Sequence, residues 1–305
     1  MKLSGYIILS GEKMTAFIVI ILLILALFMT VAAFDIGPFA LNILRRRGIG
    51  SFSSDKEWFS AAKSAAEKWL EKGFPVVPKR VQERLRIIDI IKGEYKVKAI
   101  QHWQEASVLL ALNEISPEKS AEYIKSEIAE MPSEISRVDT AMLAYAALES
   151  GKADSTDIKK FADSTAKMLM EKYERFGKIP YGGDKDICFV DTVGLVCPFL
   201  AEYGITSGNE SAVKASVSVI KSFYEKGIHK ELGLPAHCYN DKNNAPLGIY
   251  GWGRGCGWWA VGLADTYKAL DGADGYDSEK EYDSLLDITG TGIMGYIEID
   301  KIHCS

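Results

Sequence analysis

The first strong feature of the hydrophobic pattern is an unbroken apolar run near the N-terminus. Residues 15–34 read TAFIVIILLILALFMTVAAF and contain no charge. A helix of about 20 apolar residues crosses a hydrocarbon core of about 30 Å. A cleaved signal peptide is the competing interpretation, because Val31, Ala32 and Ala33 have the small side chains of a cleavage site, but the run is longer than such signals usually are. The pattern favours a retained transmembrane helix over residues 14–34, preceded by an N-terminal segment of residues 1–13.

Charges on either side of this run bear on its orientation. Lys2 and Lys13 precede the run, and three consecutive arginines, residues 45–47, follow it. By the positive-inside rule the arginines favour a single-pass protein whose C-terminal domain lies in the cytoplasm. The five cysteines form no C-x-x-C pair, which points in the same direction because it argues against a disulfide framework or a zinc site. Neither signal decides the side of the membrane.

Helical periodicity dominates the chain after a linker over residues 35–53. In DKEWFSAAKSAAEKWLEKG, residues 55–73, apolar side chains recur at spacings near three and four, and a glycine ends the run. Several later segments begin with Ser, Asp or Asn and end with Gly, as helices do. No segment shows the sustained alternation of a sheet. The pattern predicts an all-α domain over residues 54–305, with helices within residues 55–73, 98–115, 116–131, 136–151, 155–177, 188–204 and 209–227.

Two of these segments resemble each other. VDTAMLAYAAL, residues 138–148, and VDTVGLVCPFL, residues 190–200, lie 52 residues apart and share Val, Asp, Thr and two leucines at the same offsets. One predicted helix lies between them, so equivalent helices would alternate along the chain. Stacked or circularly closed helical hairpins produce such an order.

The repeat places an aspartate, Asp139 or Asp191, in the first turn of each helix. A carboxylate there interacts well with the helix dipole, so both aspartates could have purely structural roles. Alternatively, equivalent helices begin on the same side of a ring, and both carboxylates would then face one cavity. Two carboxyls in one pocket can take different pKa values, one serving as an acid while the other stays ionised. The residues themselves leave both interpretations open.

Composition excludes several classes of function. The 305 residues carry a formal net charge of −5 with no basic patch, which argues against a nucleic-acid partner. The four histidines have no metal-ligand spacing with one another, so we expect neither a metal nor another cofactor. A terpene-cyclase-like enzyme is also disfavoured, because the chain contains neither a D-D-x-x-D nor a D-x-D-D cluster.

Three motifs between Arg137 and Leu270 point to a family. FVDTVGLVCPFLAEYG, LPAHCYND and YGWGRGCGWWAVGLADTYKAL follow one another in this order. Together they resemble the unsaturated glucuronyl and rhamnogalacturonyl hydrolases of glycoside hydrolase families 88 and 105. The W-G-R-G-x-G-W stretch is the most specific of the three.

This resemblance implies an (α/α)6 toroid with the active site in its central cavity. The family removes a 4,5-unsaturated uronic acid from the non-reducing end of lyase-generated oligosaccharides. An aspartate protonates C4 of the enol ether, water adds at C5, and the resulting hemiketal collapses. The partners implied here are the oligosaccharide and, through the N-terminal helix, a membrane. Because about 250 residues follow the apolar run, we expect a toroid shortened at its C-terminus, with only the segment from about residue 278 to 302 after the last motif.

The resemblance also assigns roles to individual residues. Asp191 matches the general acid/base, and Asp139 matches a second aspartate that would position groups or stabilise charge. Arg254 would hold the uronate carboxylate, and the indoles of Trp252 and Trp258 would form stacking walls. The remaining candidates for substrate binding are Phe189, His237 and Tyr239. His237 has an alternative interpretation as a surface loop residue. The alternative function is a catalytically inactive, membrane-anchored scaffold that binds a glycan or a protein.

Overall fold

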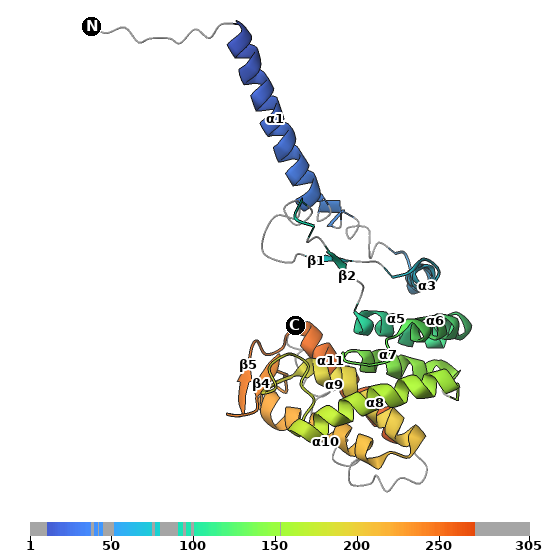
Figure 1. Ribbon diagram of the computed structural model, residues 1–305. Coiled ribbons are helices and arrows are strands. Elements are labelled where there is room, and N and C mark those ends of the chain that lie inside the picture. The colour runs from blue at the N-terminus through green and yellow to red at the C-terminus, as the bar shows by residue number, and fades with distance from the viewer. Residues whose placement is uncertain are drawn as a thin grey trace. The chain divides into compact units, whose positions relative to one another are not determined.

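The computed structural model describes residues 11–37, 40–41, 43–44, 52–74, 77–79, 91–93, 96–98, 101–152 and 154–271 (Figure 1). The chain divides into two compact units, one of residues 1–62 and 75–100 and the other of residues 63–74 and 101–305. The three arginines of residues 45–47 and the segment of residues 278–302, both used in the sequence analysis, lie outside the described residues.

The first unit contains the long apolar helix α1, Gly11–Asp35. An 18-residue window within Lys13–Asp35 has a mean hydropathy of 3.1, and the side chains of the helix are almost all exposed. The helix is therefore long and apolar enough to cross a membrane, a property that signal sequences share. The unit also holds two short antiparallel strands, β1 (Val77–Lys79) and β2 (Lys96–Lys98), which pair Val77 with Lys98.

Helices make up most of the second unit, as the periodicity predicts. The helix α3, Asp55–Lys72, begins in the first unit and ends in the second. The others are α5 (His102–Ile115), α6 (Pro117–Glu130), α7 (Thr140–Ala147), α8 (Thr156–Phe176), α9 (Val190–Ser207), α10 (Glu210–Gly227) and α11 (Gly253–Asp271). A π-helical turn, Leu148–Lys152, follows α7.

Local chemistry explains where several of these helices end. Gly177 after α8 and Gly208 after α9 have φ angles of 66° and 70°, in the left-handed region that favours glycine. The side chain of Asn209 accepts a hydrogen bond from the backbone N–H of Ala212, at 3.2 Å, and so caps α10. The predicted stop of α8 and the predicted start of α10 are thereby confirmed.

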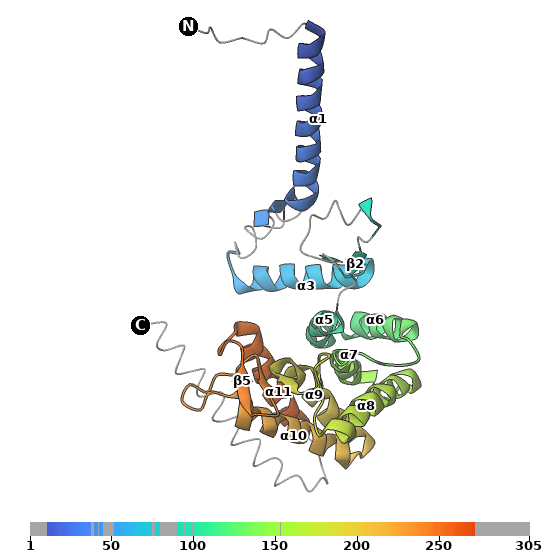
Figure 2. The same ribbon diagram turned by 60° about the vertical axis from the view of Figure 1, so that its left-hand side comes forward.

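The helices of the second unit form two layers. In one layer α5, α7, α9 and α11 follow one another, each packed against the next. The second layer consists of α6, α8 and α10, which cover the first layer from outside (Figure 2). Alternate helices along the chain are thus equivalent in position, and the two copies of the V-D-T repeat stand at the starts of α7 and α9. The order of helical hairpins predicted from the repeat is confirmed.

A small sheet accompanies the helices of the predicted all-α domain. The strands β3 (Ile187–Phe189), β4 (Cys238–Asn240) and β5 (Ala245–Leu247) form an antiparallel sheet in the order β3-β4-β5. Residues 188 and 189, predicted as helix, belong to β3, so α9 begins only at Val190. Strands of three residues are too short to display the alternation by which strands are recognised in a sequence.

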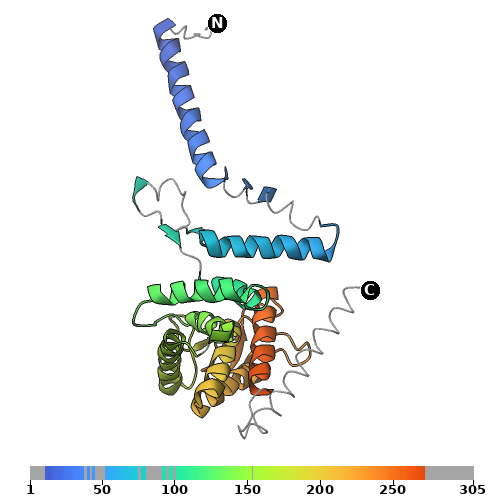
Figure 3. The same cartoon turned by 90° about the vertical axis from the view of Figure 1, so that its right-hand side faces the viewer.

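Glycines bring α9 and α11 unusually close together. Figure 3 shows α11, at the orange-red end of the colour bar, beside the yellow α9. A Cβ at Gly194 of α9 would lie 2.6 Å from the backbone oxygen of Trp258, and one at Gly262 of α11 would lie 2.8 Å from the backbone oxygen of Val193. Such distances lie below van der Waals contact, so only glycine permits this crossing. Gly257, also in α11, has open space at the same position.

The helix crossing generates a matched pair of substitutions. Gly262→Ala is expected to lower the free energy of unfolding by about 1–3 kcal/mol, because the new methyl group must push α11 away from α9. Gly257→Ala is expected to raise it by about 0.5–1 kcal/mol, since alanine is the better helix former and meets no neighbour. Urea unfolding of the full chain in detergent, followed by tryptophan fluorescence, measures both. Equal stability of the two variants would contradict the account of the crossing.

Candidate active site

Strand pairing fixes His237 beside the start of α9. The chain passes directly from β3 into α9, and the backbone N–H of Val190 donates to the carbonyl of His237 at 3.0 Å, extending the ladder between β3 and β4. His237 Nε2 consequently lies 3.7 Å from Asp191 Oδ2. Gly248, after β5, packs against His237: a Cβ at this glycine would lie 2.9 Å from His237 Cβ. The glycine therefore allows the backbone after β5 to support the histidine.

The start of α11 brings a cation and two indoles to the same place. The guanidinium of Arg254 lies 4.1 Å from the centre of the Trp252 ring, and that ring lies 4.8 Å from the His237 ring. Trp258 follows one turn later on the helix and packs against Gly194. Among the described residues, no carboxylate lies within ion-pair distance of Arg254, so its guanidinium is free to pair with a ligand.

These elements surround a cavity of about 610 Å³. Five of the eight residues that the sequence analysis singled out line it: Phe189, Asp191, His237, Arg254 and Trp258. The cavity thus combines a carboxyl, an imidazole, a guanidinium and aromatic rings, which are groups for acid–base chemistry and for holding an anionic ring. In the described part of the chain, no three His, Cys, Asp or Glu side chains are grouped so that they could hold a metal ion.

Sequence reasoning missed four polar or aromatic residues of the cavity. Gln101, Trp103 and Gln104 come from the start of α5, and Tyr181 comes from the loop before β3. The Trp103 indole N–H donates to Gln101 Oε1 at 2.9 Å, and its ring meets the Trp258 ring edge-on at 5.3 Å. The sequence signals were Trp103 at a helix start and Tyr181 beside two glycines. Aromatic residues at such places are equally typical of ordinary core packing.

Burial dominates the electrostatics of Asp191. Removal from water raises the pKa of the Asp191 carboxyl, against smaller opposing effects of its own backbone N–H, His237, Arg254 and the Trp258 indole. Asp191 Oδ2 and Trp258 Nε1 are both buried, and neither has a hydrogen-bond partner of normal geometry among the described residues. Asp191 Oδ2 therefore has unused hydrogen-bonding capacity in the wall of the cavity.

Asp139 has a different environment. It is 4% exposed, and the guanidinium of Arg137 grips it with two hydrogen bonds, Nε to Oδ1 at 2.9 Å and Nη2 to Oδ2 at 2.6 Å. Its side chain does not line the cavity. Both aspartates nevertheless act on Tyr181: burial first raises the pKa of its hydroxyl, and then Asp139 and Asp191 raise it further, while Arg137 and Arg254 oppose the shift. The two carboxylates thus converge on one side of the helical layers.

The other two candidates differ in position. Trp252 does not line the cavity but lies behind it, between His237 and Arg254. Tyr239 lies apart, in the hydrophobic core, where it is 3% exposed and packs against Phe223 with ring centres 5.6 Å apart. The strand β4, which carries Tyr239, packs against α10, and apolar residues of α10 belong to the same core. We therefore leave Tyr239 out of the candidate site.

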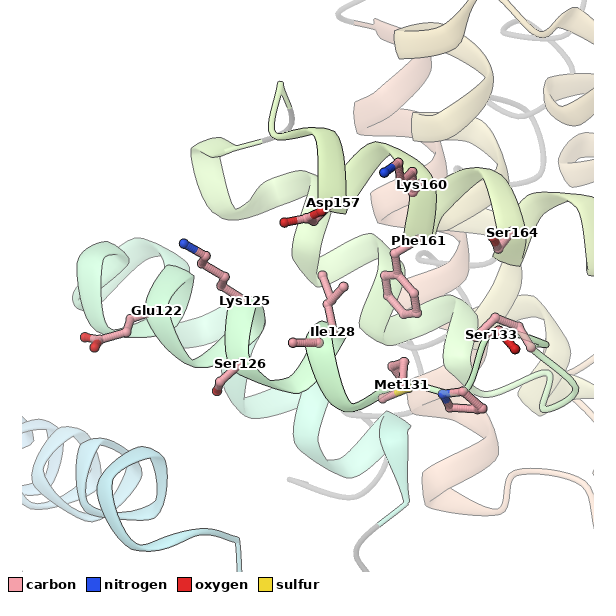
Figure 4. Close-up of a pocket in the computed structure, with 13 residues that line it drawn as sticks. Glu122, Lys125, Ser126, Ile128, Met131, Ser133, Asp157, Lys160, Phe161 and Ser164 are labelled. Atoms are coloured by element: carbon pink, nitrogen blue, oxygen red, sulfur yellow. The ribbon is translucent and has the colours of Figure 1, made fainter.

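A larger groove lies on the outer layer between α6 and α8. It measures about 640 Å³, and Figure 4 shows Ile128, Met131 and Phe161 between the two helices. The charged side chains at its edge, among them Lys125 and Asp157, are exposed to water. None of the eight residues singled out in the sequence lines this groove, so size alone does not make it the better candidate.

Comparison with known proteins agrees with the fold and the motifs. The chain resembles the crystal structure of a possible member of the GH105 family from Klebsiella pneumoniae, with a TM-score of 0.61 and 15% identity over 81% of this chain and 67% of that one. The unsaturated glucuronyl hydrolase of Bacillus sp. GL1, described as responsible for the degradation of glycosaminoglycan, gives a TM-score of 0.53 and 14% identity over 78% of this chain and 66% of that one. The chain therefore spans about two thirds of the length of these structures.

A third structure, the unsaturated glucuronyl hydrolase of Streptococcus agalactiae, gives a TM-score of 0.51 and 16% identity over 78% of this chain and 63% of that one. Among curated proteins none matches the chain by sequence. These likenesses identify the two helical layers as part of the helical toroid fold. The model of Glycosyl Hydrolase Family 88 matches residues 96–296, about two thirds of the sequence and all of the candidate site. The chain belongs to Glycosyl Hydrolase Family 88.

Proposed function

We propose that this protein hydrolyses oligosaccharides that end in a 4,5-unsaturated uronic acid, with Asp191 as the general acid and base. The observation that carries the proposal is the pairing of a buried carboxyl of raised pKa with an unpaired guanidinium, that of Arg254, in one aromatic-lined cavity. An acid must hold its proton near neutral pH to deliver it, and a raised pKa serves this need. The unsaturated glucuronyl hydrolases among the similar structures support the same substrate class.

The proposed reaction begins with protonated Asp191. Its proton passes to C4 of the unsaturated ring, which breaks the C4–C5 double bond and leaves positive charge on C5 and the ring oxygen. The Asp191 carboxylate then accepts a proton from a water molecule as the water oxygen bonds to C5. The resulting hemiketal opens, and the sugar at C1 is released as an alcohol. Asp191 ends the cycle protonated, so the net change is the addition of one water molecule.

The other residues of the cavity bind and orient the ring in this proposal. Arg254 holds the carboxylate at C5 with two parallel hydrogen bonds, and Trp252 beneath it keeps the guanidinium in place. Trp258 and Trp103 form an aromatic wall, and Phe189 adds a further aromatic ring to the lining. His237 lies 3.7 Å from Asp191. When its imidazole is charged, it stabilises the ionised carboxylate that activates the water molecule. Asp139 has a positioning role, exerted through Arg137 and Tyr181.

We also propose that α1 is retained as a single-pass membrane anchor, with the glycosidase domain on the cytoplasmic side. Its length and apolar composition support anchoring, and the arginines after it support this orientation. Protease treatment of right-side-out vesicles tests the side: the domain should survive intact until the vesicles are broken. Degradation in sealed vesicles would place it outside, and recovery of a shorter, detergent-independent protein would identify a cleaved signal sequence.

Asp191→Asn tests the proposed acid. The substrates are lyase-generated unsaturated disaccharides, whose conjugated double bond absorbs ultraviolet light, and the absorbance is lost on hydration. The variant is expected to lower kcat by about 10²–10⁴-fold, because the proton donor is removed. Asp157→Asn, which changes an exposed aspartate in the first turn of α8, is the matched control and should keep full activity. No loss of absorbance with folded wild-type protein would favour the glycan- or protein-binding scaffold.

The same variants separate catalysis from folding. Because the pKa of Asp191 is raised on folding, the native state binds its proton more tightly, and stability falls as pH rises through the raised pKa. Asp191→Asn removes this loss, so at pH 7 it is expected to unfold at a higher denaturant concentration than wild type. The advantage should shrink as pH falls toward 3.8, the ordinary value for an aspartate. A variant less stable than wild type at pH 7 would contradict the raised pKa.

Arg254→Gln tests the recognition of the carboxylate. Loss of a bidentate, charge-assisted pair is expected to raise KM for the free acid by about 10–100-fold. The control is a substrate whose uronate carboxyl is methyl-esterified, because it carries no charge for the guanidinium to pair with. Wild type and variant should differ little on the ester. Equal losses on both substrates would show that Arg254 acts on something other than the carboxylate.

A further inference from the structure

A second, smaller cavity lies on the other side of Phe189. It measures about 250 Å³, below the about 300–1,000 Å³ of pockets for drug-sized ligands. Its charged groups are Lys178 from the loop after α8, Lys226 from α10 and Asp241, the residue that follows β4. Phe189 lines both cavities, but Asp191, His237 and Arg254 do not line this one. The small cavity is therefore distinct from the candidate active site.

Two ammonium groups in this cavity share a single carboxylate. Lys178 Nζ lies 2.5 Å from Asp241 Oδ2, and Lys226 Nζ lies 2.7 Å from Asp241 Oδ1. The Lys178 side chain is 16% exposed and that of Lys226 28%. One positive charge thus remains uncompensated among the lining residues, in a place where water screens it poorly. The nearby Lys242 does not add to it, because it forms its own ion pair with Asp186 at 2.8 Å.

The wall of this cavity contains a buried side chain whose hydroxyl has no partner among the described residues. Thr192, in the first turn of α9, lines the cavity and is 3% exposed. Its Oγ1 has no hydrogen-bond partner among the described residues. An unsatisfied buried hydroxyl costs free energy, so such groups normally have a partner. An oxygen atom of a ligand in the cavity would provide one.

We propose that this cavity binds a small oxyanion of the phosphate or sulfate type. The spare positive charge would pair with the anion, and Lys178 and Lys226 would donate to its oxygens while still holding Asp241. Thr192 would donate its hydroxyl hydrogen to another oxygen, and the N-terminus of α9 adds favourable polarity. Ser222, which also lines the cavity, supplies a further donor. This inference does not rest on the proposed hydrolase activity.

Calorimetric titration of the full chain with inorganic phosphate tests the proposal. The protein is held in uncharged detergent, with ionic strength matched by chloride, and sulfate is titrated in parallel. Wild type is expected to bind one equivalent saturably. Lys226→Gln is expected to weaken binding about tenfold or more, and Thr192→Val about threefold to tenfold. Lys242→Gln is the matched control, because its lysine lies nearby in its own ion pair, and it should bind as wild type does.

A further variant distinguishes this cavity from the candidate active site. Arg254→Gln should leave phosphate binding unchanged; if it abolishes binding while Lys226→Gln does not, the anion binds beside Asp191 and the proposal fails. Absence of saturable binding to wild type, or an equal effect of Lys242→Gln and Lys226→Gln, overturns it as well. Unfolding temperatures in chloride identify any variant that does not fold. Lys178→Gln then replaces Lys226→Gln, with the same expected loss.

Discussion

The close packing of α9 against α11 supports both the fold and the candidate site. Gly194 and Gly262 let the backbones approach until a single methyl group on either would collide with the other helix. Protein interiors are too densely packed to absorb such a group without moving the helices. At the head of the same crossing, α11 carries Arg254 and Trp258 over the start of α9, where Asp191 stands. A shift of either helix would therefore change the core and the cavity together.

The small sheet adds the second constraint. The pairing of β3 with β4 fixes where the chain enters α9. His237 directly precedes β4, and its backbone bond with Val190 extends this pairing by one residue, which places it beside Asp191. The carboxyl is then subject to opposing influences: burial favours its protonated form, while the guanidinium and imidazole favour the charged form. Burial is the largest of these influences, so the net effect is a raised pKa. Arg254 lies near enough to oppose this shift, but it forms no ion pair with Asp191, so the effect of burial prevails.

Features that depend on neighbouring residues, such as helices and their ends, could be predicted from the sequence. Contacts between residues that are distant along the chain could not. Periodicity and glycine stops located the helices, since amphipathic spacing and C-caps such as Gly177 are local properties. The motifs named five residues of the cavity, because the family resemblance carries their positions. Trp103 and Tyr181 escaped notice, since nothing along the chain indicates that α5 and the loop before β3 face α11. Tyr239 lies outside this cavity, and its adjacency to His237 in sequence does not reveal its packing against α10.

The internal repeat places two carboxyls at matching positions in different surroundings. Asp139 and Asp191 occupy equivalent positions at the starts of α7 and α9. Two residues earlier, the first copy has Arg137 and the second has Phe189. The arginine grips Asp139 with two hydrogen bonds and keeps its charge paired, whereas the phenylalanine offers Asp191 a wall without hydrogen bonds. Of the two, only Asp191 lines the cavity. The residue two positions before each aspartate thus gives the two copies of the repeat different surroundings for the same carboxyl.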